Sequence, residues 1–524
     1  MGFGGVVGMG KGGNSLATAR GPAEVPLARG KDGGQMFSAL EVASHHTPDD
    51  CWVVVNGGVY DVTSFVPRHP GGAMIYVKAG GDCTQLFESY HPLSAAAILR
   101  KYRIGSVDVA SYTDPAYVST SQPRVLYNTA EADSNSELAQ TTSSEFYSAL
   151  KARQENYFKS KGLKPRVSSA MYSKSAVILV SLVVAYIGTY FTWVEGKDSL
   201  LMPFLCALAM GLGKMSVGVS IQHDANHGAY SENTALAWIM GTTLDWVGAS
   251  SFMWKQQHVV GHHAYTNVEG QDPDIRTNDP DVRCVSEQQP RRPYHAWQHV
   301  YLPFMYGLLS FKSIFADDFQ SFFAGRIGPV HVAKMTAAES AVFWGGKLFY
   351  ALVYVALPLQ YVSLTRFLLL WACSEAVTGY GLAFMFQVAH VVEDAFLHDV
   401  RWDRNSGVVT AGRGLTLAED SKRQCPADDW AGIQVATSAN FSLQDAFWTF
   451  MSGGLNYQVE HHLFPGVCHC WYPHLEAGVR ETCAEFGLPY YAYDTFPQAL
   501  LSHFEYLRKV GGGKALGLPR LGDA

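Results

Sequence analysis

Charged side chains are scarce in this sequence. Asp, Glu, Lys and Arg make up 16% of its 524 residues, whereas hydrophobic residues make up 48%. Soluble globular domains contain about 25% charged residues, so this shortage argues against a wholly soluble protein and indicates membrane-embedded segments. The formal net charge is −7 and no long basic block is present, which excludes the usual electrostatic basis for binding nucleic acid.

The nine cysteines lack the paired spacing typical of structural zinc sites. Cys468 and Cys470 form the only close pair, and an odd, dispersed set indicates reduced thiols that face cytosol or stroma. The sequence also lacks an apolar segment behind its first residues, which disfavours a secretory signal peptide. We interpret the glycine-rich residues 1–35 as a disordered extension, with a transit peptide as the alternative.

Long apolar stretches are present, and they come in two pairs. Each is about long enough to cross a bilayer, and they span residues 175–194, 199–221, 341–364 and 366–386. Each pair predicts an out-and-back hairpin, so the termini and the segment between the pairs share one side. The lysines and arginines before the first stretch assign that side to the cytosol or its equivalent. Lys214, Lys347 and Glu375 fall inside these stretches, where they either pair or line a cavity, or else mark helix ends.

Residues 36–110 have the mixed composition of a small soluble module. They contain His69 in the run His-Pro-Gly-Gly and, further along, His91. Two histidines that each lie just off a helix or tight turn can bind a haem from both faces, and glycine lets the backbone pass close to the ring. Together with the run YDVTSF, this pattern resembles cytochrome b5. The resemblance implies a low-spin haem b that carries one electron, with His69 and His91 as its axial ligands.

Histidines also form three short clusters, which we name the histidine boxes. Box one is His223 and His227, box two is His258, His262 and His263, and box three is Gln458, His461 and His462. Residues four apart share one face of a helix, so the first and fifth positions of each box, Gln458 included, face the same way. Chance is a poor explanation for three such clusters on one side of a membrane. His390 lies where the fourth apolar stretch reaches that side, and it joins the set as a predicted ligand.

The number of these side chains indicates two metal ions. The boxes and His390 together offer eight histidines and Gln458, more than the four ligands of a structural zinc site. Neutral imidazoles suit zinc, copper, iron and nickel. A haem that donates single electrons favours redox-active iron, because zinc has no use for them. We therefore expect two non-haem iron ions, with Gln458 as a ligand through its amide oxygen.

Residues from about 36 to 505 resemble the front-end fatty acyl desaturases that carry a fused cytochrome b5 domain. The resemblance rests on the runs QHDANHGA, QHVVGHHAYTN and GGLNYQVEHHLFP, which look closest to algal delta-5 or delta-4 enzymes, and on the glutamine that opens box three. It implies a multi-pass α-helical membrane domain at 171–505, with two transmembrane hairpins and a cytosolic histidine-rich di-iron cap. A linker at 111–170 joins it to an N-terminal α+β haem domain at 36–110, and residues 506–524 form a tail.

The same resemblance implies the chemistry and the partners. Such an enzyme uses O2 and electrons that pass singly from NADH-cytochrome b5 reductase, or from ferredoxin in a plastid, through the haem to the di-iron site. It inserts a cis double bond between the carboxyl end and an existing double bond of a polyunsaturated acyl lipid. The implied location is the membrane of the endoplasmic reticulum or the plastid envelope.

Other functions are compatible with the sequence. A sphingolipid long-chain-base desaturase or a fatty acyl hydroxylase can carry the same module and boxes, and analysis of the product separates these enzymes. A membrane-anchored cytochrome b5-type electron carrier, with boxes that hold structural zinc or no metal, predicts the absence of non-haem iron.

Overall fold

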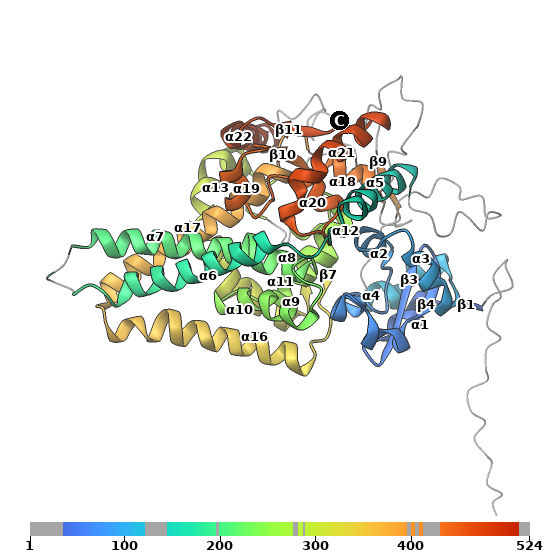
Figure 1. Ribbon diagram of the computed structural model, residues 1–524, viewed down its shortest axis with the longest axis horizontal. Helices are drawn as coiled ribbons and strands as arrows, with labels where there is room; N and C mark the ends of the chain where they lie inside the picture. The colour runs from blue at the N-terminus through green and yellow to red at the C-terminus, as the bar shows by residue number, and fades with distance from the viewer. Residues whose placement is uncertain are drawn as a thin grey trace, which may run out of the picture.

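A computed structural model describes residues 35–120, 144–194, 197, 199–275, 281–286, 289–395, 400–403, 408–411 and 430–512. The predictions for the glycine-rich extension, the centre of the linker and the end of the tail fall outside these residues. Within them, a module of sheet and helices lies beside a helical body whose apolar helices point away from it (Figure 1).

The N-terminal module is built on a five-stranded sheet with the order β1-β5-β4-β3-β2. Asn56 and Gly57 both adopt positive φ and form the tight turn of the β3–β4 hairpin, as expected for an Asn-Gly pair. The elements are β1 (Gln35–Phe37), α1 (Ala39–Ser44), β2 (His46–Thr47), β3 (Asp50–Val55), β4 (Gly58–Asp61), α2 (Thr84–Tyr90), α3 (Ala95–Leu99) and β5 (Arg103–Val107). The predicted α+β fold of this module is confirmed.

The range that the sequence assigns to a linker contains two helices, α4 (Pro115–Thr120) and α5 (Glu145–Lys161). α5 is packed into the helical body: Phe146 and Leu150 are buried in a hydrophobic cluster with Trp430 and Phe464. The hydroxyl of Tyr147 donates to the carbonyl of Leu463 at 2.6 Å. The C-terminal part of the predicted linker is therefore a helix of the body, because its apolar side chains pack into the hydrophobic core of that body.

Within the part of the chain that the structure describes, four helical segments are long and apolar enough to cross a membrane, as predicted. They are Ser169–Tyr190 (α6), Leu201–Asn226, Ala337–Gln360 and Leu364–His390 (α17). The second comprises α7 (Leu201–Ser216), the π-helical turn η5 (Val217–Ile221) and α8 (Gln222–Asn226), and the third begins with α16 (Ala337–Tyr350). Figure 1 shows both hairpins turning at the end of the molecule opposite the N-terminal module.

Buried charges join these helices. Lys214 on α7 donates to Glu375 on α17, and both side chains are buried. Tyr350 from α16 also donates to Glu375 at 2.6 Å, while Lys347 pairs with Asp318 at 2.5 Å. Of the two interpretations of these charges, the structure therefore supports pairing inside the bundle over placement at helix ends.

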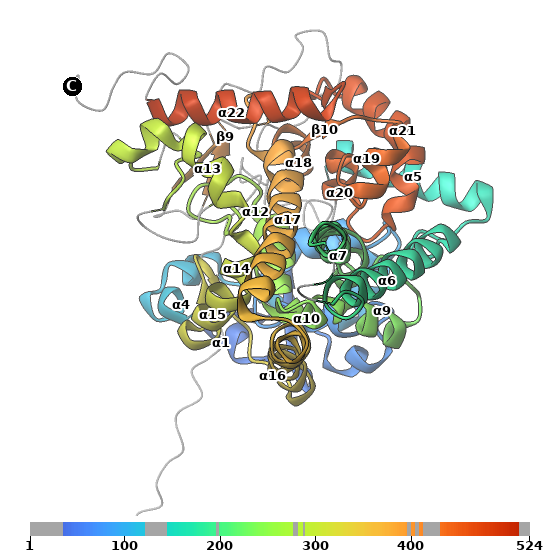
Figure 2. The same cartoon turned by 90° about the vertical axis from the view of Figure 1, so that its left-hand side faces the viewer.

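A cap of C-terminal helices covers the end of the bundle from which the hairpins start. It consists of α18 (Trp430–Ala436), α20 (Gln458–Leu463), α21 (Tyr472–Glu485) and α22 (Phe496–Gly512), with β10 (Ala439–Phe441) parallel to β11 (Tyr491–Tyr493). Figure 2 looks along α7 and α16, with α22 crossing above them. The ends of α8 and α17 thus lie beneath the cap, because His223 and His390 group with His461 and His462 of α20.

The remaining helices and strands of the described residues are short. They are α9 (Thr234–Gly241), α10 (Thr243–Trp246), α11 (Ser251–Trp254), α12 (His263–Tyr265), α13 (Gln298–Tyr306), α14 (Leu309–Lys312), α15 (Asp318–Ala324), α19 (Ala446–Met451) and the small hairpins β6 (Arg326–Ile327) with β7 (Val330–His331) and β8 (Val400–Asp403) with β9 (Val408–Ala411).

Candidate metal centre and haem site

The histidines of the three boxes converge on one buried place under the cap. Their ligand atoms form two main groups, each within 4.8 Å: group one is His223, His227, His258 and His461, and group two is His262, His390 and His462. Each group draws on several elements that are far apart in the sequence. The structure therefore brings together the seven box histidines and His390, which are the eight histidines that the sequence predicts as ligands.

His263 lies between the two groups. Its Nε2 is 3.2 Å from Nε2 of His258 and 3.1 Å from Nε2 of His461, and its ring stacks on that of His462 with centroids 4.4 Å apart. Imidazole nitrogens that face one another at such distances form a set of donors that a shared ion could bind. His263 is thus placed to serve either group.

Gln458 belongs to group two by position. Its Nε2 lies 2.8 Å from Nε2 of His390, and its Oε1 is buried without a hydrogen-bond partner among the described residues. Burial of an amide oxygen without a hydrogen-bond donor costs free energy. A cation bound to this oxygen would remove that cost. This position beside His390 is compatible with the predicted role of Gln458 as a ligand.

Local structure explains how the boxes reach the centre. Box one ends the second membrane segment, where η5 and α8 continue α7. Box two lies on η6 (Lys255–His262) and the first residue of α12, and the wider turn of the π-helix η6 brings side chains five residues apart together. For this reason the Nε2 atoms of His258 and His263 lie 3.2 Å apart. The predicted pairing of His258 with His262 is also present, because ligand atoms of these two residues and of Asp274 lie within 4.8 Å of one another, and His262 belongs to group two as well.

Outer hydrogen bonds orient the imidazoles. Nδ1 of His258 lies 2.9 Å from Asp274, and Nδ1 of His262 lies 2.9 Å from Asp272. His390 bonds the carbonyl of Thr437 at 3.0 Å, and His462 bonds Oε1 of Gln434 at 2.8 Å. Because these acceptors hold the Nδ1–H tautomer, each Nε2 keeps its lone pair for a metal. Nε2 of His227 and of His262 are buried and have no hydrogen-bond partner among the described residues, so the donor set fits bound metal ions.

Burial keeps most of these rings neutral. Desolvation lowers the pKa of His227, His263, His461 and His462 well below 6.5, and neighbouring imidazoles lower it further. His262 is different: burial lowers its pKa, but the carboxylates of Asp272 and Asp274 together raise it above 6.5. Neutral imidazole is the form that binds a metal.

The sequence did not reveal Asp272 and Asp274 as part of the centre. They lie in an acidic loop that has the composition of a solvated segment, yet Asp272 is fully buried. The signal that could have found them is the closeness of two aspartates to box two. Asp224, Asn226 and Glu460 lie inside the boxes but bond elsewhere, to His469, to Gly241 and to Tyr490 respectively.

The second site lies in the N-terminal module, where His69 and His91 face each other. Their Nε2 atoms are 3.4 Å apart, and their Nδ1 atoms bond the carbonyls of Gly72 and Phe87 at 3.2 and 2.9 Å. A side chain at Gly71 would place its Cβ 2.8 Å from the His69 ring, so glycine is required there. With both Nδ1 atoms held, two Nε2 lone pairs are directed at one point, which fits a bis-histidine haem.

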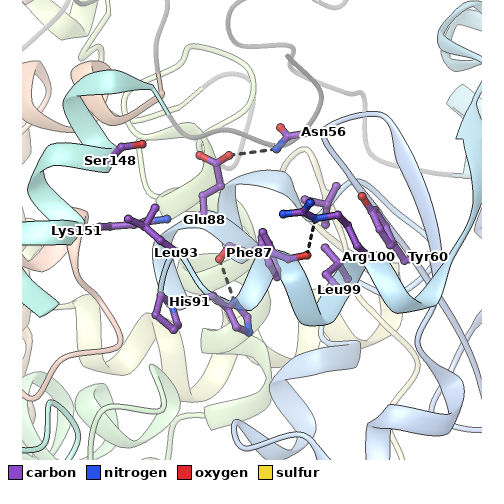
Figure 3. A pocket seen from close by; sticks show the side chains of 13 residues that line it. Asn56, Tyr60, Phe87, Glu88, His91, Leu93, Leu99, Arg100, Ser148 and Lys151 are labelled. Atoms are coloured by element: carbon purple, nitrogen blue, oxygen red, sulfur yellow. Dashed lines mark hydrogen bonds between the residues drawn. The ribbon is translucent and has the colours of Figure 1, made fainter. Parts of the chain in front are cut away.

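A cavity opens beside His91 between this module and α5. Its lining includes Val55, Tyr60, Phe87 and Leu99, and Ser148 and Lys151 reach into it from α5. Figure 3 shows His91 bonded to Phe87 on one side of this cavity and Lys151 on the other. Residues of both the module and the helical body thus line the cavity at the candidate haem site.

Comparison with known proteins identifies both parts. Residues 198–494 match the family described as "Fatty acid desaturase", and residues 38–108 match the family described as "Cytochrome b5-like Heme/Steroid binding domain". Cytochrome b558 of Ectothiorhodospira vacuolata, a solved structure, is 42% identical and covers 14% of this chain and 95% of its own, with a TM-score of 0.13.

Relatives with desaturase names match this chain over most of its length. The Acyl-lipid (8-3)-desaturase of Physcomitrium patens is 48% identical over 91% of both chains. The Acyl-lipid (8-3)-desaturase of Mortierella alpina is 35% identical over 92% of this chain and 98% of its own. The Delta(5) fatty acid desaturase A of Dictyostelium discoideum is 34% identical over 91% and 94%.

A haem-binding module fused to a membrane domain with a buried histidine centre defines an oxygen-dependent, membrane-bound oxidoreductase. This chain belongs to the fatty acid desaturase family, in the front-end group with a fused cytochrome b5 domain. The resemblance seen in the sequence is thereby confirmed, and the sphingolipid, hydroxylase and electron-carrier alternatives are not favoured.

Proposed function

We propose that this protein inserts a delta-5 double bond into polyunsaturated acyl chains carried by glycerolipid. The observation that carries the proposal is the pair of histidine groups joined by His263, in a chain that also holds a bis-histidine haem site. Relatives named (8-3)- and Delta(5)-desaturases support delta-5 over delta-4 among the positions that the sequence left open.

The residues of the centre would hold two non-haem iron ions. Group one would bind one ion and group two, with Gln458, the other, while His263 lies within reach of both. Iron bound there supplies the activation of dioxygen that removes two hydrogens from neighbouring methylenes. The haem site in the same chain, which delivers single electrons, supports iron over zinc.

The surrounding residues prepare the centre for this reaction. Asp272, Asp274 and Gln434 hold the imidazoles in one orientation and one tautomer, so little reorganisation is needed during turnover. Every box histidine is buried, and the cap closes over them. Exclusion of water protects reactive species from side reactions.

Electrons would reach the centre through His69 and His91 from NADH-cytochrome b5 reductase. The basic residues that precede α6 support a cytosolic position for the haem module, the cap and both termini, and a reductase that uses NADH favours the endoplasmic reticulum over the plastid envelope. Microsomes test this: NADH should reduce the haem in the presence of purified reductase, and ferredoxin should not. The reverse preference would contradict the assignment of reductase and organelle.

Product analysis tests the proposed function. Yeast that expresses the chain is fed polyunsaturated C16 to C20 acids, and double bonds are located by gas chromatography with mass spectrometry. We expect a new delta-5 bond that is absent in His461→Ala, with equal haem absorbance in both strains. A delta-4 product would overturn the regiochemistry, a hydroxylated product would overturn desaturation, and no product from any lipid-bound or free substrate would contradict the proposal.

A further inference from the structure

The end of α2 carries two adjacent side chains that face two different sites. His91 follows the helix, and its Nε2 faces His69 in the haem site. Tyr90 is the last residue of the helix, and its hydroxyl lies 2.5 Å from Nδ1 of His227 in group one. A single peptide unit therefore connects a haem-facing histidine with a residue that touches the metal centre.

The chemistry of His227 fixes the direction of this hydrogen bond. Its Nε2 is buried and has no hydrogen-bond partner among the described residues, whereas its Nδ1 is paired with Tyr90. A histidine that binds a metal through Nε2 carries its hydrogen on Nδ1. Nδ1–H of His227 thus donates to the phenol oxygen, as His258 donates to Asp274. The difference is that Tyr90 belongs to the haem module.

The membrane domain leaves room for the Tyr90 ring. Gly466 lies four residues beyond the last histidine of box three, and a Cβ on it would be 3.1 Å from Cδ1 of Tyr90. That distance is tighter than ordinary contact, so a larger side chain would displace the ring. The turn after box three is therefore shaped to receive Tyr90.

Further contacts hold the haem module in this position. Lys78 donates to the hydroxyl of Tyr265, two residues after box two, at 3.2 Å. The amide of Leu93 donates to Glu155 on α5 at 3.0 Å. Arg166 donates to the carbonyl of Pro70, which follows His69, at 3.5 Å. The neighbours of both haem-facing histidines thus bond to the membrane domain.

We propose that Tyr90 is the positioning residue that couples the haem module to the metal centre. Its hydroxyl orients His227, and one peptide unit joins it to His91. An electron can therefore pass from the haem module to the metal centre at the contact between Tyr90 and His227. In each transfer a ferrous haem held by His69 and His91 would lose one electron and a ferric ion held by the histidine groups would gain it, with no atom exchanged. Two such transfers would serve each double bond. The inference rests on the proposed function, which assigns haem and iron to the two sites.

Haem reoxidation in the purified full-length protein tests the proposal. The haem is reduced anaerobically with reductase and NADH, then mixed with dioxygen and substrate, and its Soret band is followed by stopped flow. Loss of an outer hydrogen-bond partner typically costs 10–100-fold, so we expect Tyr90→Phe to slow reoxidation about tenfold. Static haem spectra and iron content should not change. Tyr102→Phe, whose ring packs on Phe65 inside the module, should reoxidise at the wild-type rate.

A second variant and a second readout separate coupling from folding. Gly466→Val should displace the Tyr90 ring and slow reoxidation while the phenol itself is retained. In iron-free protein, hydrogen–deuterium exchange of residues 84–95 should be faster in Tyr90→Phe and Gly466→Val than in wild type and Tyr102→Phe. Faster exchange in these two variants alone supports a docking contact at this point.

Two results would overturn the inference. Reoxidation of Tyr90→Phe at the wild-type rate would show that electron transfer does not depend on this contact. A slower rate that is fully explained by a lower iron content would show that Tyr90 acts only in metal binding. Failure of the proposed function is recognised separately, because wild-type protein would then contain no non-haem iron or make no unsaturated product.

Discussion

Asp274 and Asp272 show how single residues set the properties of the centre. Each accepts a hydrogen bond from Nδ1 of one imidazole of box two, which leaves the Nε2 lone pair free for a metal. Such outer partners raise the basicity of a ligand and hold its ring in place. The acidic loop therefore orients two imidazoles of the candidate metal centre.

We predict that Asp274→Asn lowers desaturation about 10–100-fold. An amide can accept a hydrogen bond but removes the negative charge beside His258. Product formation per haem, measured in microsomes, checks this. Asp281→Asn is the matched control, since Asp281 lies in the same loop and caps the amide of Arg283. Equal losses in both variants would show that the loop, and not the bond to His258, matters.

Gln458 allows a similar test in group two. We predict that Gln458→Ala retains haem but lowers the iron content by about one ion per protein, because it removes the buried amide beside His390. Iron and haem are measured together on the purified variant. Retention of full iron content and activity would mean that Gln458 is not a ligand.

At the scale of elements, the bundle is joined by a buried ion pair between α7 and α17. Glu375 accepts hydrogen bonds from Lys214, Tyr350 and Ser310. Removal of one partner of a buried pair leaves an uncompensated charge, which costs about 3–5 kcal/mol, whereas an apolar replacement of both is often neutral. The pair thus fixes how the two hairpins meet.

We therefore predict that Glu375→Gln lowers the thermal unfolding midpoint in detergent, and that the double variant Lys214→Met, Glu375→Leu recovers most of the loss. Haem absorbance reports the N-terminal module separately and should not change in either protein. A double variant as unstable as the single one would contradict this account of the ion pair.

The membrane segments and the box histidines were predictable from sequence because each depends on local spacing. An apolar stretch of bilayer length and a histidine pair four residues apart are visible without a fold. The π-helix of box two, the burial of Asp272 and the packing of α5 were not visible, because each depends on contacts between residues distant in the chain. The same holds for Tyr90, whose neighbour His227 is 137 residues away.

At the scale of the whole molecule, the haem module rests directly on the domain that would use its electrons. Contacts of Tyr90 and Leu93, on either side of His91, reach box one and α5, and Lys78 reaches Tyr265 just after box two. A fused module held in this way needs no diffusional encounter before each electron transfer. The fold thus combines an electron carrier with its acceptor.

We predict that His91→Ala abolishes haem absorbance and desaturation but leaves the non-haem iron content unchanged. The loss follows because His91 is a proposed axial ligand and lies outside the two metal groups. Visible spectra, iron analysis and product analysis of one preparation check the three parts. Desaturation that persists without haem would show that electrons enter by another route.

The measurement that tests the account most directly is the ratio of non-haem iron to haem in the purified full-length protein. Iron and zinc are determined by mass spectrometry, and haem by its pyridine haemochrome spectrum. The account predicts about two non-haem iron ions per haem, and fewer in His461→Ala at equal haem content. Zinc in place of iron, or no metal beyond the haem iron, would contradict a di-iron desaturase centre.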